Sequence, residues 1–285
     1  MQKRAIAIHD ISCVGRCSLT VALPILSAAG LNTAVIPTAL LSTHTGEFTG
    51  YTHLDLSSQL SPIAEHLATL DLHYDAFYSG YLANGAQVDE VLRIIDLLCD
   101  EKTHIFVDPA FGDHGRMYSL MDPSMPSQMR KLCTCARTIV PNLTEAAFLL
   151  NEPYPGEAAD EACISRFCEK LIALGPENAV ITDVHFREGE TGVAILSRGM
   201  DKPVYLFRER FPHVFHGTGD VFASFLLSAL MNGQSLVQSV NTALDLIQQA
   251  IRETLMDGEP LRYGVHFEEV LPEVVRMHNA AKVKE

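Results

Sequence analysis

The sequence has no long uninterrupted hydrophobic segment. Its longest run of small or apolar residues, 221–231, spans 11 residues and includes two serines, whereas a helix needs about 20 apolar residues to cross a bilayer. The first ten residues have only a four-residue apolar stretch, which is too short for the core of a secretion signal. These absences predict a protein that has no membrane partner and stays in the cytoplasm.

Basic side chains are scarce relative to acidic ones. The chain carries 21 Lys and Arg against 35 Asp and Glu, which gives a formal net charge of -14 at pH 7. An electrostatic field of this sign repels the phosphate backbone of nucleic acids and anionic lipid surfaces. We therefore expect no nucleic-acid partner.

Cysteine patterns typical of metal or disulfide proteins are also missing. The 7 cysteines include no C-x2-C pair and no histidine at zinc-finger spacing, so we expect reduced thiols. Cys133 and Cys135 could hold a soft metal, but two small, partly buried residues near a strand are the better interpretation. The remaining composition, 47% hydrophobic and 20% charged over 285 residues, is typical of a globular protein. Without a linker or internal repeat, residues 1–285 are expected to form a single domain.

Short β-rich runs alternate with longer helical patterns along the whole chain. Strands are predicted at 5–9, 33–38, 76–79, 104–108, 138–140, 179–182, 192–196 and 204–207. Helices are predicted at 18–29, 56–70, 86–98, 144–150, 158–174, 218–231, 236–254 and 267–280. This alternation predicts an α/β fold, with a mostly parallel central sheet and helices on both faces. Between 181 and 211 strand follows strand, which predicts an antiparallel section.

Several predicted strands end directly in polar residues. The segments are 8–10, 36–38, 107–109, 140–142 and 181–183. In an open α/β sheet, ligands bind beyond the carboxyl ends of the strands. We therefore expect the functional site along this edge.

The sharpest functional motif is HGTGD at 216–220, which leads directly into an apolar helix. Glycines before a helix let backbone N–H groups converge on an anion, so Gly217, Thr218 and Gly219 predict a phosphate site. Asp220 is a poor phosphate ligand but suits a general base, and with an ordinary pKa near 3.9 it would be ionised at neutral pH. The alternative is that Thr218 and Asp220 only cap the helix. The chain has no Gly-Lys dipeptide, so this is no Walker loop.

Two further segments offer carboxylates. In PNLTE at 141–145, Asn142 as N-cap with Glu145 three residues later fits a capping box, and the same carboxylate can hold a water on Mg²⁺. Asp108 ends a strand and is followed by Pro109, which blocks a helix, so its carboxylate is offered at the sheet edge. For Asp108 a simple Asp-Pro turn is an equal alternative.

The loop at 41–51 is rich in hydroxyl groups and contains His44 and two aromatic residues. This composition suits contact with a flat polar ring, although a solvated loop histidine is the simpler interpretation. The same ambiguity holds for the YSGY segment at 78–81, where Tyr78 is expected in the core.

Together and in this order, these segments resemble the ribokinase-like superfamily and, within it, the bacterial pyridoxal (pyridoxine, pyridoxamine) kinases. The similarity runs from residue 5 to about residue 250. It is carried by STHT at 42–45 with TG at 49–50, SGYL at 79–82, DP with GD at 108–113, PN with Glu145, and GTGD at 217–220. The resemblance implies an ATP-dependent kinase that phosphorylates the hydroxymethyl group of pyridoxal, pyridoxamine or pyridoxine, giving the 5′-phosphate. It also implies a homodimer without the separate lid domain of sugar kinases.

The resemblance assigns roles by position. It makes Asp220 the base and the amides of 217–219 the anion hole. The residues that it assigns to nucleotide binding are Asp108, Asn142, Glu145 and Thr182, and among these Asp108 and Glu145 also serve the metal. It implies Mg²⁺ and ATP, because an acidic protein needs a cation to offset the charge of ATP. It leaves open a monovalent cation.

The resemblance places Asp10, His44, Thr45 and Tyr81 at the acceptor substrate. Asp10 is a departure, since many pyridoxal kinases have Ser there, and a carboxylate could favour a cationic vitamer such as pyridoxamine. The preferred vitamer therefore stays open.

Two alternatives are weighed against this interpretation. Hydroxymethylpyrimidine kinases of thiamine synthesis share the glycine motif, but they usually have a Gly-Gly-Ala-Gly-like stretch after the first strand, where this chain has SCVGRC at 12–17. A vitamer-binding protein without catalysis would be favoured by the loss of the base, and Asp220 is present.

Overall fold

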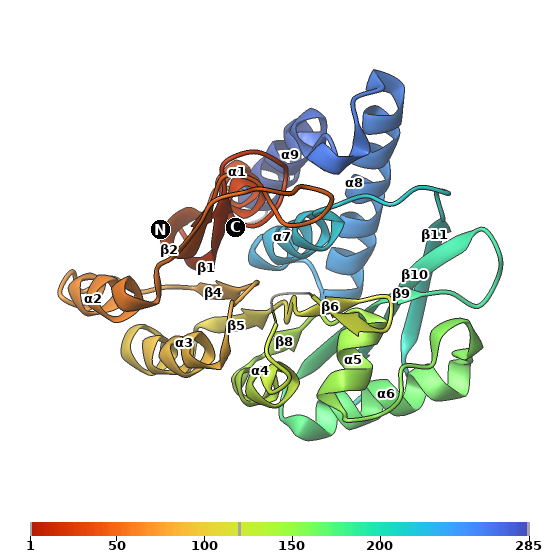
Figure 1. The fold of residues 1–285 in the computed structure, drawn as a ribbon, viewed down its shortest axis with the longest axis horizontal. Helices are drawn as coiled ribbons and strands as arrows, with labels where there is room; N and C mark the ends of the chain where they lie inside the picture. Colours follow the sequence, from red (N-terminus) through yellow and green to blue (C-terminus); the bar gives the residue numbers. More distant parts are fainter. Residues whose placement is uncertain (1, 119–120, 284–285) are drawn as a thin grey trace. The chain divides into compact units, whose positions relative to one another are not determined.

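The computed structural model describes residues 2–118 and 121–283. It is an α/β fold whose mainly parallel sheet is flanked by helices (Figure 1), as predicted. The chain contains two compact units. Unit 1 consists of Met1–Tyr78, Leu97–Thr103 and Pro212–Glu285, and unit 2 of Ser79–Asp96 and His104–Phe211. That residues 1–285 act as a single kinase domain stays a prediction.

The centre of unit 1 is its first strand, in which residues 5–8 have no exposed surface. Its strands are ordered β4-β1-β2-β3, with β1 and β2 parallel and β2 and β3 antiparallel. Helix α1 packs on β1 and β2 and against α7, which packs on α8 (Figure 1). The elements are β1 (Arg4–Ser12), α1 (Leu19–Ala28), β2 (Asn32–Leu41), β3 (His53–Asp55), α2 (Ser57–Ala68), β4 (Ala76–Ser79), α7 (Thr218–Met231), α8 (Leu236–Asp257), η2 (Leu261–Tyr263), η3 (Phe267–Val270) and α9 (Leu271–Lys282). Because β1 is buried along its length, the residues at its carboxyl end are held rigidly beside the start of α7.

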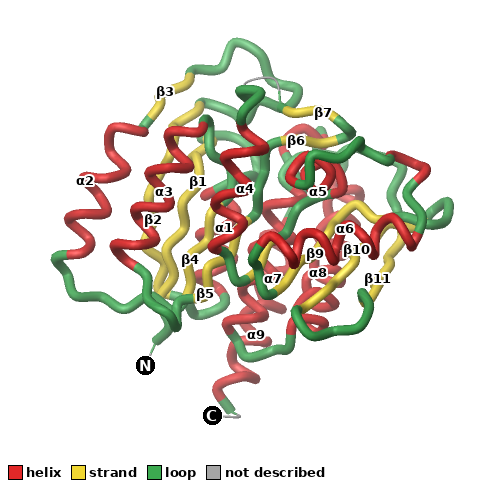
Figure 2. Tube along the Cα trace, turned by 90° about the horizontal axis from the view of Figure 1, so that it is seen from below, coloured by secondary structure: helices red, strands yellow, loops and turns green. Residues whose placement is uncertain are grey.

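Unit 2 contains the antiparallel section expected from the sequence. Its strands are ordered β11-β10-β9-β8-β5, with β5, β8 and β9 parallel and β9, β10 and β11 antiparallel. Figure 2 shows β9, β10 and β11 side by side. The elements are α3 (Gly85–Leu98), β5 (His104–Val107), β6 (Gly112–Asp113), β7 (Arg116–Met117), α4 (Met125–Cys135), β8 (Thr138–Ile139), α5 (Leu143–Leu149), η1 (Gly156–Ala158), α6 (Glu161–Leu174), β9 (Asn178–Val184), β10 (Glu190–Ser197) and β11 (Val204–Glu209). The hairpin β6–β7 packs at the start of α5.

All eight predicted strands and all eight predicted helices are present, with ends shifted by a few residues. The sequence analysis missed α4 and the short strands β3, β6 and β7. Cys133 and Cys135 therefore lie at the end of a helix, where Cys133 is buried and Cys135 is exposed, rather than both being partly buried. In the part of the chain that the structure describes, no helix is long and apolar enough to span a bilayer.

Candidate active site

The start of α7 in unit 1 is shaped for close approach to other groups. Gly217 is its N-cap, with φ 72°, and a Cβ atom there would lie 1.9 Å from the Arg16 carbonyl oxygen, so only glycine fits. The N-cap makes no side-chain hydrogen bond to the helix. A Cβ on Gly219 would meet nothing within 4 Å. A glycine N-cap without a side-chain bond is compatible with a phosphate site at the first amides of α7, and that site stays a prediction beside the alternative of a simple cap.

Asp220, in the first turn of α7, bonds to another segment rather than to its own helix. Its Oδ2 accepts a hydrogen bond of 2.9 Å from the Ser18 amide, and 16% of its side-chain surface is exposed. Burial raises the pKa of Asp220 to about 7; the Asp10 carboxylate adds to this effect, and the Ser18 amide opposes it. The expectation of an ordinary pKa is therefore wrong. A carboxylate with this pKa holds a proton about half the time at neutral pH, which suits a general base.

Asp10 and Ser18 form the immediate surroundings of Asp220. Asp10 is 5% exposed, accepts a hydrogen bond from the Ser12 hydroxyl at 3.3 Å and also bonds to the Ser18 side chain. Burial raises the pKa of Asp10 as well. Ser18 has φ 53° and ψ -134°, a conformation that L-residues rarely adopt. In this strained conformation Ser18 serves both carboxylates, one with its amide and one with its side chain.

His9, which the sequence analysis did not single out, is the third polar group beside Asp220. It is fully buried, its ring packs edge-on against Tyr78 at 4.4 Å, and its Nδ1 lies 3.9 Å from Asp220 Oδ1. Burial lowers the pKa of His9 to about 3, so the ring is neutral at physiological pH. It therefore offers Asp220 a dipole and no charge. The only sequence signal was its place in the polar strand end at 8–10.

His44 is packed rather than solvated. Its Nδ1 accepts from the Gly46 amide at 3.1 Å and its Nε2 lies 2.6 Å from the Arg262 carbonyl oxygen, which fixes the proton on Nε2. The centre of its ring lies 4.8 Å from that of the Phe48 ring and 5.2 Å from that of the His216 ring. Because both nitrogens are engaged, His44 can meet a substrate through its ring face and not as a donor. Thr45 is exposed in the same loop.

The start of α5 in unit 2 is a complete capping box, as predicted. Asn142 Oδ1 accepts from the Glu145 amide at 2.9 Å, and Glu145 Oε2 accepts from the Asn142 amide at 2.9 Å. Glu145 Oε1 also accepts from the amides of Phe111 at 2.9 Å and Gly112 at 3.4 Å. Thr182 lies beside Asn142 in a β-bridge, so the structure brings these two predicted nucleotide residues together.

Carboxylates gather around this capping box. Burial raises the pKa of Glu145 to about 8, with the three amides opposing and Asp113 adding to the rise. Asp108 is 7% exposed, and both Asp108 and Glu145 raise the pKa of the buried Cys133 thiol, after the larger effect of burial itself. Burial also raises the pKa of Asp183, and the Asp113 carboxylate adds a smaller effect. Carboxylate oxygens are the kind of donor that Mg²⁺ prefers, so Asp108 is of the right type for that ion, whereas both oxygens of Glu145 already accept hydrogen bonds from backbone amides.

The predicted site residues fall into two groups. Unit 1 holds Asp10, His44, Thr45, Asp220 and the 217–219 segment. Unit 2 holds Asp108, Asn142, Glu145, Thr182 and a half-buried Tyr81.

Comparison with known proteins identifies the family of this chain. Residues 23–262 match the family described as phosphomethylpyrimidine kinase. A Bacteroides thetaiotaomicron protein assigned as a phosphomethylpyrimidine kinase, in a crystal form with pyridoxal, is 35% identical with a TM-score of 0.91, over 96% of each chain. The pyridoxal kinase of Lactobacillus plantarum is 30% identical with a TM-score of 0.89, over 98% of this chain and 99% of that one. The Bacillus subtilis hydroxymethylpyrimidine/phosphomethylpyrimidine kinase is 27% identical over 207 residues, 71% of either chain. The matched family spans most of the sequence, so this chain belongs to the phosphomethylpyrimidine kinase family of the ribokinase-like superfamily, with pyridoxal kinases among its structural neighbours.

Proposed function

We propose that this kinase transfers the γ-phosphoryl group of ATP to the hydroxymethyl group of pyridoxal, pyridoxamine or pyridoxine, giving the 5′-phosphate. The observation that carries the proposal is Asp220, whose pKa burial raises to about 7, in the first turn of a helix whose N-cap is a glycine. Similarity to a protein crystallised with pyridoxal and to a pyridoxal kinase supports the acceptor. Every comparison above is with a kinase, which supports ATP as the donor.

In the proposed reaction, Asp220 accepts the hydroxyl proton while the hydroxymethyl oxygen attacks the γ-phosphorus. The Ser18 amide orients one carboxylate oxygen and leaves Oδ1, on the His9 side, without a charged competitor. The amides of 217–219 and the dipole of α7 stabilise negative charge on the transferring group. The absence of a Cβ at Gly219 leaves room for a phosphate oxygen to approach the backbone.

The capping box of α5 is proposed to face the nucleotide. Asp108 and Glu145 would hold Mg²⁺, which neutralises phosphate charge when it is bound, and Asn142 and Thr182 would contact the nucleotide. A monovalent cation, a homodimer and a cytoplasmic location belong to the same proposal.

The acceptor is proposed to lie against Asp10, His44, Thr45 and Tyr81. The ring of His44, fixed by two hydrogen bonds, offers a flat surface to a pyridine ring. A carboxylate at position 10 favours an acceptor that carries positive charge, such as pyridoxamine.

The second candidate is phosphorylation of hydroxymethylpyrimidine, in thiamine synthesis. It is favoured by the matched family and by the Bacillus subtilis relative. A binding protein without catalysis has no such support, because the proposed base is in place.

A coupled assay of ADP release with pyridoxal, pyridoxamine, pyridoxine and hydroxymethylpyrimidine tests the proposal. We expect Mg-ATP turnover with at least one B6 vitamer and weaker or no turnover with hydroxymethylpyrimidine. Turnover with hydroxymethylpyrimidine alone would transfer the assignment to thiamine synthesis. Vitamer binding without ADP release would favour the binding protein.

A further inference from the structure

The turn at 13–17, between β1 and α1, is enclosed by two glycines from distant parts of unit 1. The Arg16 carbonyl oxygen touches Gly217, as described above, and a Cβ on Gly264 would lie 2.8 Å from Arg16 Cβ and 2.9 Å from its carbonyl oxygen. The Arg16 amide donates to the Tyr263 carbonyl oxygen at 2.9 Å. The backbone of Arg16 is therefore packed between the phosphate loop and the C-terminal segment of unit 1.

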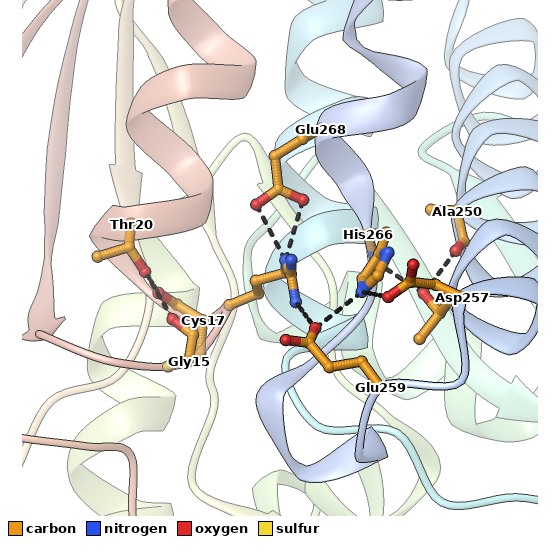
Figure 3. A network of polar contacts seen from close by, with 10 residues as sticks. Gly15, Cys17, Thr20, Ala250, Asp257, Glu259, His266 and Glu268 are labelled. Carbon is orange, nitrogen blue, oxygen red and sulfur yellow. Dashed lines mark hydrogen bonds and ion pairs between the residues drawn. The ribbon is translucent and has the colours of Figure 1, made fainter.

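The Arg16 side chain extends this contact through charge. Its Nε donates to both carboxylate oxygens of Glu268 at 2.9 Å, and its Nη1 donates to Glu259 Oε2 at 3.1 Å. Figure 3 shows the side chains of Glu259 and Glu268 in this network. The arginine side chain is 24% exposed, so most of it is shielded from water. A guanidinium that bonds to two carboxylates at once restrains its backbone better than a single surface ion pair does.

Glu259 is itself held from the end of α8. His266 Nε2 lies 3.0 Å from Glu259 Oε2, the His266 amide donates to Thr254 Oγ1 at 2.8 Å, and Thr254 donates to the Ala250 carbonyl oxygen at 2.7 Å (Figure 3). Arg16 supplies the positive charge beside these acidic groups. The network thus connects the C-terminal part of α8 with the turn that precedes α1.

We infer that Arg16 is a positioning residue for phosphoryl transfer, because the ion pairs with Glu259 and Glu268 fix the turn that carries the Ser18 amide to Asp220 and that packs on Gly217. The inference rests on the proposed role of Asp220. Arg16 needs no contact with either substrate. Its effect passes through two neighbouring residues of the chain, to a strained Ser18 that would relax if the turn were released.

Loss of the Arg16 ion pairs is expected to change the pKa of Asp220 through Ser18. The Ser18 amide is the hydrogen bond that opposes the raised pKa of Asp220, so weakening it raises that pKa further. The other titratable groups that face Asp220 are the neutral His9 and the Asp10 carboxylate from β1, and the buried Cys17 thiol from the turn. None of them replaces an amide donor, so the acid limb of kcat/KM moves to higher pH.

The test compares Arg16→Gln, Arg16→Lys and Glu268→Gln with the control Arg276→Gln, which removes an ion pair with Glu273 on α9. With the vitamer that the wild type turns over, Arg16→Gln is expected to lower kcat by about 10-fold to 100-fold, with KM for ATP unchanged. It should also move the acid limb upward by about half a pH unit or more. Arg16→Lys should recover part of kcat, and Arg276→Gln should change neither quantity. An acid limb that stays at its wild-type position in Arg16→Gln would overturn the inference, even if kcat fell.

Amide hydrogen exchange separates this inference from the proposed function, because it needs no substrate. Arg16→Gln should speed exchange in peptides covering 13–18 and 216–221 and leave α9 unchanged, and the loss of Glu268 should do the same to a smaller degree. Faster exchange without vitamer turnover by the wild type would refute the proposed function and keep the positioning role. Unchanged exchange in both peptides would refute the positioning role whatever the activity.

Discussion

The starts of α5 and α7 each hold a carboxylate three residues after the N-cap, but the two carboxylates are bonded differently. Glu145 at α5 accepts hydrogen bonds from three backbone amides and is 2% exposed. Asp220 at α7 accepts one from Ser18 and keeps 16% of its side chain exposed. The N-cap of α5 is an asparagine that bonds to its helix, whereas that of α7 is a glycine that does not.

This difference separates a carboxylate whose two oxygens both accept hydrogen bonds from backbone amides from one that accepts a single such bond. At α5 the amides are used within the protein, and they bring the loop after β5 onto the helix. At α7 we propose that the amides and one carboxylate oxygen meet a ligand. Burial raises the pKa of both groups, so a raised pKa alone does not distinguish the two roles. The number of hydrogen bonds that each carboxylate accepts does distinguish them.

The largest expected effect is on catalysis, from Asp220→Asn. The amide keeps the size of the side chain and can still accept from Ser18, but it cannot take up the hydroxyl proton. We expect kcat to fall by about 100-fold or more while ATP still binds. Steady-state kinetics together with ATP titration measure both quantities. A near-normal kcat would show that Asp220 is structural, like Glu145.

The stability of the same variant is its control for folding. The raised pKa of Asp220 contributes stability below the ordinary pKa of 3.8, and this contribution is lost as the pH rises towards about 7. Asp220→Asn should therefore be more stable than the wild type at pH 8, by on the order of 1–3 kcal/mol, with the gain fading towards pH 4. A melting temperature lower than that of the wild type at pH 8 would mean that lost folding explains lost activity.

The next effect is on stability, from Glu145→Gln. The NH2 group of the new side chain would face backbone N–H donors, either that of Asn142 or those of Phe111 and Gly112. Because two donors cannot bond to each other, we expect the free energy of unfolding to fall by about 1–3 kcal/mol. If Glu145 also serves the metal, the Mg²⁺ concentration for half-maximal rate rises as well. Glu273→Gln, in the first turn of α9, is the matched control and should change neither. A lower melting temperature with unchanged Mg²⁺ dependence would leave Glu145 only its structural role.

The smallest effect is on pH dependence, from Asp10→Asn. The Asp10 carboxylate helps to raise the pKa of Asp220, so its removal lowers that pKa and moves the acid limb of kcat/KM to lower pH, by about one unit or less. The same change should weaken selection for pyridoxamine over pyridoxine. A pH–rate profile for each vitamer measures both. An acid limb that moved upward would show that Asp10 does not act on Asp220 through its charge.

Much of the fold could be predicted because its elements have clear sequence periods. The missed helix α4 has its buried positions filled by Met125, Met129, Leu132 and Cys133, and Cys133 and Cys135 were interpreted as two small, partly buried residues near a strand. The capping box of α5 and the start of α7 are local motifs, so both could be placed from the sequence. The strain at Ser18, the role of His9 and the pKa of Asp220 could not, because tertiary packing imposes all three.

The buried thiols determine how this protein reacts with electrophiles and oxidants. Burial raises the pKa of Cys99 and Cys168 to about 12 and that of Cys17 and Cys133 further still. The thiolate is the reactive form, so these four groups are nearly inert at physiological pH. Alkylating reagents should therefore modify the exposed Cys13 and Cys135 before these four thiols. Because Cys13 lies in the turn beside Arg16, a fluorescent maleimide placed there would report directly on movements of that turn.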